Sequence, residues 1–188
     1  MIRSVDREHD FTLILRGIRE LKRSIVDALF EAGCDDATLG MSCGVAHLDF
    51  TRAAPTMKDA ILSAIADVRR VGMGIDVLRI DCDSLLTQAE IARKIGKSRQ
   101  AVHQYIRGDC GPGGFPQPAR KGASGQPLWQ WCAVAQWLCQ HDMAPAGLVS
   151  DAEAVDTINC VLDYTWKRKH QSALVREVRT AMAGKRTA

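Results

Sequence analysis

The stretch TQAEIARKIGKSRQAVHQYIRG, residues 87–108, decides the central fold of this 188-residue chain. Thr87 and Glu90 have the spacing of a capping box, so a helix is predicted to begin directly after Thr87. Gly96 follows about two turns later and can adopt the positive φ that ends a helix. Ser98 is a favoured N-cap, so a second helix is predicted to start there.

The two predicted helices have apolar faces that can pack against each other. Ile91 and Ile95 lie four residues apart on the first helix, and Val102 and Ile106 lie four apart on the second. Residues with this spacing share one helix face. Ala92 is small enough for the helices to cross closely. The pattern therefore predicts a tight pair of helices joined by a glycine turn.

The outward face of the second predicted helix, about Ser98–Arg107, is polar and has no carboxylate. Arginine and glutamine can form paired hydrogen bonds with base edges, and arginine and serine also reach phosphates. Residues 87–126 hold seven basic and two acidic residues, although the whole chain has a net charge of only +3. Plain helical bundles also contain such helix pairs, but the acid-free outer face of the second helix favours DNA binding over that alternative, and the basic block indicates a polyanionic partner.

A β-hairpin is predicted after the helix pair, over about Phe115–Trp131. The sequence GPGGFPQP, residues 111–118, excludes a helix, and a Gly/Ser-rich tip follows at residues 122–125. The first strand is expected to begin near Phe115. Apolar residues after the hairpin predict a short helix, and the large aromatic side chains are interpreted as core. These aromatic residues are Trp129, Trp131 and Trp137.

The segment from about Leu85 to Leu138 resembles the winged helix-turn-helix of MerR-like and excisionase-like proteins. The spacing of Ala92, Gly96 and Val102 carries the resemblance, together with the proline-flanked strand, the flexible tip and the aromatic strand. It implies a recognition helix in the major groove and a wing against the DNA backbone or in the minor groove. On this interpretation Ser98, Arg99, Gln100, His103 and Gln104 face bases, while Lys97, Arg107, Arg120 and Lys121 hold phosphates. The chain departs from the family at Cys132 and Ala133, where Ser or Thr followed by Asp commonly caps the last helix.

The N-terminal region, residues 1–84, is predicted to be a ferredoxin-like βαββαβ domain. Alternating or apolar strands are expected near residues 11–16, 37–41, 45–50 and 75–80, with helices over 21–32 and 56–72. The phrase Asp27–Thr38 resembles the N-terminal part of some uncharacterised bacterial helix-turn-helix proteins. Asp35 and Asp36 are interpreted as acids that cap backbone N–H groups in a turn.

The C-terminal region, residues 148–183, is predicted to be one long helix or two shorter ones. Ser150 and Glu153 have capping-box spacing. The apolar stripe packs either on the same chain or on a second copy in a homodimer, and the basic run at residues 167–170 either contacts phosphates or is solvated. The expected fold class is thus α+β, with a central domain at 85–142. The apolar stripe comprises Val155, Ile158, Leu162, Trp166, Leu174, Val178 and Met182.

The sequence therefore predicts a sequence-specific double-stranded DNA-binding transcriptional regulator, acting as a repressor and as a homodimer on an operator. Two alternatives remain open. One is an antitoxin-like autorepressor that also binds a partner protein, and the other is an excisionase-like factor that bends DNA. A metabolite-sensing N-terminal domain would be a variant of the main prediction.

No enzyme, cofactor or metal site is expected. The chain has no GxSxG, HExxH or P-loop motif, and none of its seven cysteines forms a CxxC pair. No catalytic residue is therefore predicted. No apolar run approaches the roughly 20 residues that cross a bilayer, and residues 1–10 lack the apolar centre of a signal peptide. A cytoplasmic protein without membrane partners is expected.

Overall fold

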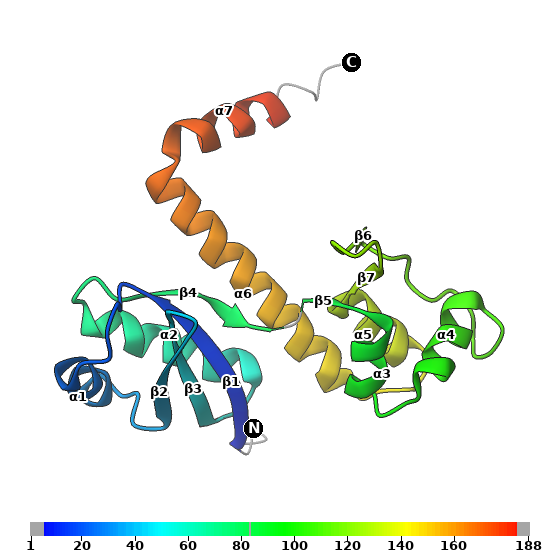
Figure 1. Ribbon diagram of the computed structural model, residues 1–188, viewed down its shortest axis with the longest axis horizontal. Helices are drawn as coiled ribbons and strands as arrows, with labels where there is room; N and C mark the ends of the chain where they lie inside the picture. The colour runs from blue at the N-terminus through cyan, green and yellow to red at the C-terminus, as the bar shows by residue number, and fades with distance from the viewer. Residues whose placement is uncertain (1–5, 83, 184–188) are drawn as a thin grey trace, which may run out of the picture. The chain divides into compact units, whose positions relative to one another are not determined.

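The computed structural model describes residues 6–82 and 84–183. They belong to two compact units, one reaching to Asp81 and resuming at Thr157, the other spanning Cys82–Asp156 (Figure 1). The predicted α+β class is confirmed. The predicted segment 148–183 is shared between the units, because helix α6 (Ala146–His170) contributes its first turns to the second unit and its remainder to the first.

The first unit contains an antiparallel four-stranded sheet in the order β2-β3-β1-β4. The predicted β-α-β-β-α-β order is confirmed. The buried side chains of this unit, including Leu13, Leu48 and Ile61, form its core, and the sheet lies on one side of that core. The elements are β1 (Arg7–Arg16), α1 (Arg23–Glu31), β2 (Ala37–Ser42), β3 (Val45–Ala54), α2 (Met57–Val71) and β4 (Asp76–Asp81).

Local sequence signals fix the ends of these elements. Gly33, with φ +97°, follows α1, and the Cys34 N–H reaches back to the Leu29 carbonyl at 3.0 Å. The Thr56 hydroxyl caps α2 by accepting the Asp59 N–H at 3.1 Å. Both helix ends lie where glycine and threonine predict them.

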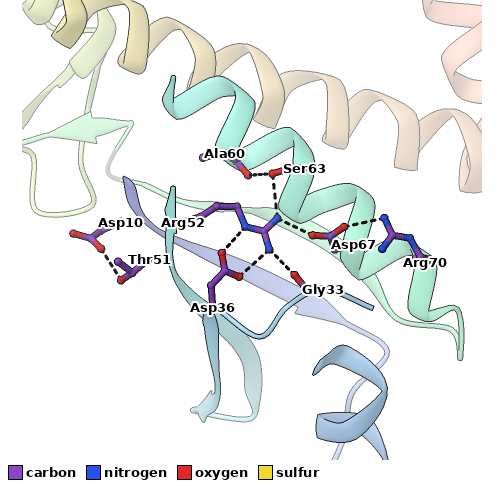
Figure 2. A network of polar contacts seen from close by, with 9 residues as sticks. All are labelled: Asp10, Gly33, Asp36, Thr51, Arg52, Ala60, Ser63, Asp67 and Arg70. Atoms are coloured by element: carbon purple, nitrogen blue, oxygen red, sulfur yellow. Dashed lines mark hydrogen bonds and ion pairs between the residues drawn. The ribbon is translucent and has the colours of Figure 1, made fainter. Parts of the chain in front are cut away.

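A buried arginine ties the sheet to the helical layer. Arg52 of β3 donates to the carboxylates of Asp36 and Asp67, to the Ser63 hydroxyl and to the Gly33 carbonyl (Figure 2). The hydrogen bonds to Asp36 raise the pKa of Arg52, against the opposing effect of burial. The interpretation of Asp36 as a backbone cap is therefore wrong for its side chain. Its partner lies 16 residues away, and turn chemistry alone does not reveal it.

Helix α6 contacts the sheet edge through Asn159. Its Oδ1 accepts the Ile80 N–H at 2.7 Å, and its Nδ2 donates to the Ile80 carbonyl at 3.1 Å. The Arg16 guanidinium lies 5.3 Å from the Trp166 ring centroid. The amide of Asn159 thus satisfies backbone groups of an edge strand, which would otherwise be open to pairing.

The C-terminal region forms two helices, α6 and α7 (Ser172–Ala183), one of the two predicted outcomes. The predicted capping box at Ser150 and Glu153 is wrong, because α6 already begins at Ala146, directly after Pro145. Proline is favoured at a helix start, since its missing N–H is not needed there. Both residues of the predicted box therefore lie inside the helix.

The second unit surrounds an aromatic core. Trp129, Trp131 and Trp137 are buried in it, as predicted. Within the described residues of both units, no helix is long and apolar enough to span a bilayer. The small sheet has the order β5-β7-β6. The elements are β5 (Leu85–Leu86), α3 (Gln88–Lys94), α4 (Arg99–Arg107), β6 (Arg120–Lys121), β7 (Pro127–Gln130) and α5 (Trp131–Gln140).

Candidate nucleic-acid interface

The capping box predicted at the start of α3 is present. The Glu90 carboxylate accepts the Thr87 N–H at 2.7 Å and the Thr87 hydroxyl at 2.8 Å. In return, the Glu90 N–H bonds to the Thr87 Oγ1 at 3.3 Å. The Thr87 backbone bond lowers the pKa of Glu90, and the hydroxyl bond adds to this effect. The start of α3 is therefore fixed by the two residues that the sequence identifies.

The turn between α3 and α4 is a Schellman motif. The Lys97 N–H bonds to the Ala92 carbonyl at 2.9 Å, and the Gly96 N–H bonds to Arg93 at 3.3 Å. Gly96 has φ +65°. A side chain at this position would strain the backbone. The Ser98 hydroxyl then accepts the Ala101 N–H at 3.1 Å and starts α4.

Helix α4 has one buried side and one exposed polar side. Val102 is fully buried, and Tyr105 and Ile106 pack beside it against the same core. Arg99 and His103 lie on the opposite side and are exposed. At 100° per residue, Gln100, Gln104 and Arg107 complete that side. The second helix therefore presents a polar side on which Arg99, Gln100, His103 and Arg107 are exposed.

The structure places eight of the nine predicted DNA-contacting residues at the surface, and Gln104 is partly buried at the rim of the α4 face. Six of them lie on the turn and α4, and two lie on β6. Ser98 acts as the N-cap, but its hydroxyl proton stays available to donate. The exposed eight are Lys97, Ser98, Arg99, Gln100, His103, Arg107, Arg120 and Lys121.

Arg107 has an acidic partner that helix periodicity does not reveal. Its Nε lies 3.1 Å from a carboxylate oxygen of Asp109, and both side chains are more than half exposed. An exposed ion pair of this kind is worth about 0–1 kcal/mol. A phosphate could therefore replace Asp109 as the partner of Arg107 at little cost.

The β6–β7 hairpin is shorter than predicted. Its first strand is Arg120–Lys121 and does not begin near Phe115, so that part of the predicted Phe115–Trp131 hairpin is wrong. Gly122 and Gln126 close the tip with an N–H···O bond of 2.7 Å. Prolines at 116 and 118 lack the N–H groups that strand pairing needs. Arg120 and Lys121 thus form the exposed first strand of a small hairpin, directly before its tip.

The segment before β6 is held by two tryptophans. The Trp129 indole N–H donates to the Pro116 carbonyl at 3.0 Å, and the Trp137 indole N–H donates to Gly113 at 2.8 Å. Phe115 lies edge-on to both rings. This loop is therefore anchored to the core by side chains, in place of a strand ladder.

Helix α5 starts at Trp131, inside the predicted hairpin range, and has no side-chain cap. The N-cap residue is Gln130, so the expectation that Cys132 and Ala133 stand directly before this helix is wrong, and both lie in its first turn. The Trp131 N–H instead bonds to the Ser84 carbonyl at 2.8 Å. A backbone carbonyl thus satisfies one of the donors that a cap would serve.

Sequence reasoning missed two residues that shape this surface. The Gln88 side chain donates to the Arg99 carbonyl at 2.8 Å and joins the first turn of α3 to that of α4. Lys94 lies over the Trp131 ring, 5.0 Å from its centroid, and adds a further exposed cation. The basic block contains Lys94, but no spacing rule indicates its ring contact.

The described residues contain no group of three or more His, Cys, Asp or Glu side chains that could hold a metal ion. Comparison of the chain with models of protein families, with curated proteins and with solved structures finds no match. The chemistry of this surface must therefore be argued from its own residues.

Proposed function

We propose that this protein is a sequence-specific double-stranded DNA-binding transcriptional regulator. In this proposal α3 and α4 act as a helix-turn-helix, α4 is the recognition helix in the major groove, and the β6–β7 hairpin is the wing. Arg99, Gln100 and His103 read base edges, with Ser98 and Gln104 beside them. Lys97, Arg107, Arg120 and Lys121 hold phosphates.

One observation carries the proposal: the exposed side of α4 bears arginine, glutamine and histidine and no carboxylate, while its other side is committed to the core through Val102. A helix that only served packing would have no need of an acid-free outer face. The Schellman turn supports the proposal, because it fixes where α4 leaves α3.

The first unit is proposed to be a ferredoxin-like domain, supported by its strand order and antiparallel register. This arrangement serves many unrelated activities, so it does not choose among sensing, docking and assembly. Repression is the expected consequence where the bound site overlaps a promoter. Such a regulator would act in the cytoplasm.

A homodimer on an inverted repeat is part of the proposal, since one helix and one hairpin cover too little DNA for high specificity. Helix α7 supports it. Leu174, Val178 and Met182 are 55%, 48% and 73% exposed on this helix, and α7 has no buried residue. A second copy would cover Leu174 and Val178 of this stripe. Sedimentation of wild type beside Leu174→Gln/Val178→Gln tests this part.

The main test is a mobility-shift assay with duplex DNA from upstream of the protein's own gene, competed by scrambled DNA of equal length. We expect competitor-resistant binding that Arg99→Ala/Gln100→Ala abolishes. The matched control is Arg19→Ala/Lys58→Ala, which changes two exposed residues of the first unit. Absence of binding to any duplex at low salt would refute the proposal.

A further inference from the structure

An open cleft lies between the end of α6 and helix α7, and three arginines line it. Arg168 comes from the end of α6, and Arg176 and Arg179 come from α7. Its volume is about 810 Å³, and the remaining lining residues are Ser172, Thr180 and the apolar Val175, Met182 and Ala183. The three guanidinium groups therefore belong to one concave surface, within the same unit of the chain.

No carboxylate neutralises this cleft within the described part of the chain. The nearest acids in sequence are Asp163 and Glu177, and neither lines the cleft. The Asp163 carboxylate is occupied by Lys167, with Nζ at 2.7 Å. Arg179 contacts a neutral partner, the Tyr164 hydroxyl, with Nη1 at 3.5 Å. Like charges repel each other at close range. Three arginines without an acid beside them therefore create a positive potential that favours binding of an anion.

The side chains suit an anion with several acceptor oxygens, such as phosphate. Guanidinium groups bind phosphate oxygens bidentately, and hydroxyls such as those of Ser172 and Thr180 add single donors. The cleft is open: none of its lining residues is buried. A small-molecule site commonly encloses 70–90% of its ligand, so this open surface suits an extended backbone better than a free metabolite.

We propose that this arginine cleft binds phosphate groups of the DNA backbone and provides a second contact, independent of base sequence. The inference rests on the proposed function and goes beyond it, because it gives the C-terminal helices a direct part in DNA affinity. Phosphate contacts of this kind supply affinity and a steep salt dependence, while base contacts supply specificity.

The test compares the full-length protein with Arg168→Gln/Arg176→Gln/Arg179→Gln. Glutamine has a helix propensity close to that of arginine, so α6 and α7 should persist. Circular dichroism checks that they do. Affinity for operator and scrambled duplexes is measured by fluorescence anisotropy over a salt series. We expect equal losses for both duplexes. The slope of log K against log salt should become shallower by up to about 2.7, at roughly 0.9 for each phosphate.

The matched control is Arg19→Gln/Arg23→Gln/Lys58→Gln, which removes the same charge from exposed sites elsewhere in the first unit. An unchanged slope in the cleft variant, or an equal change in the control, overturns the inference and leaves the proposed function standing. Equal affinity of the wild type for operator and scrambled duplexes, with binding that the cleft variant abolishes, supports the cleft while refuting the proposed sequence-specific function. A wild type that binds no duplex overturns both.

Discussion

Both carboxylate oxygens of Asp36 accept hydrogen bonds from the guanidinium of Arg52, at 2.7 and 2.8 Å. The Arg52 side chain is only 9% exposed. This bidentate pair joins the loop after α1 to the central strand β3, and the Asp67 carboxylate on α2 completes the cation's surroundings at 2.7 Å. One cation thus connects three separate segments of the first unit.

Replacing Arg52 with leucine should strongly destabilise the first unit. The change removes the cation and leaves the largely buried carboxylates of Asp36 and Asp67 without this partner. Breaking a buried ion pair in this way typically costs about 3–5 kcal/mol of stability. Hydrogen exchange of β1 and β3 amides reports opening of this unit. Arg52→Lys should recover only part of the loss, because an ammonium cannot reach all the acceptors that the planar guanidinium bonds.

Arg23→Leu is the control, since the Arg23 side chain is 94% exposed and lies 3.9 Å from its acidic partner. This substitution should leave the hydrogen-exchange rates of the β1 and β3 amides nearly unchanged. If the β1 and β3 amides exchanged as slowly in Arg52→Leu as in wild type, the Arg52 network would have no role in stability.

The Glu90 carboxylate should make the second unit depend on pH. Its pKa is lowered in the folded chain by the Thr87 bonds. The stabilisation is therefore fully present above the unfolded pKa of about 4.3 and is lost as pH falls through the lower folded value. Glu90→Gln should reduce stability by about 1 kcal/mol at pH 7, and the difference from wild type should shrink as the pH falls below the unfolded pKa.

Urea unfolding followed by tryptophan fluorescence, at several pH values, checks this dependence. Asp109→Asn is the matched control, because its carboxylate pairs only with exposed Arg107. A constant difference between Glu90→Gln and wild type from pH 3 to pH 7 would show that the charge of Glu90 plays no part.

The sequence predicts those features that local chemistry specifies. Thr87, Glu90, Gly96 and Ser98 each act within four residues, so the helix pair and its turn follow from spacing alone. The order of strands and helices along the chain of the first unit follows from alternation and helical spacing in the same way.

Features that depend on distant partners were not predictable. Arg52 meets Asp36 only after β3 has been placed in the sheet, and the loop at Pro116 is held by Trp129, 13 residues onward. A long amphipathic helix also has several plausible starts, so Ser150 has the spacing of a cap although α6 begins earlier, at Ala146. Long-range hydrogen bonds and competing starts thus account for most of the errors.

Trp129→Phe should loosen the β6–β7 hairpin. The change leaves the Pro116 carbonyl without its indole donor, which costs about 1–3 kcal/mol when the group stays away from water. The Ala119 N–H, bonded to the Leu128 carbonyl at 2.8 Å, should then exchange faster. Trp166→Phe in the first unit is the control. Unchanged exchange at Ala119 would show that the strand ladder alone holds the hairpin.

Arg99 and Lys121 should differ in how their loss affects DNA binding. Arg99 lies in the first turn of α4, where a recognition helix meets base edges, and Lys121 lies on β6 at the proposed wing. Arg99→Ala should relax preference at one base pair by about 1–3 kcal/mol. Lys121→Ala should weaken all duplexes alike and make the salt slope shallower by about 0.9.

Anisotropy titrations against a preferred duplex, chosen from a randomised pool, and against its single-base variants separate these effects. Arg93→Ala, an exposed basic residue at the end of α3, is the control for loss of charge alone. A uniform loss in Arg99→Ala would make Arg99 a phosphate contact and shift base reading to Gln100 and His103. A base-specific loss in Lys121→Ala would instead place the hairpin in a groove, because only base edges distinguish one sequence from another at a fixed backbone geometry.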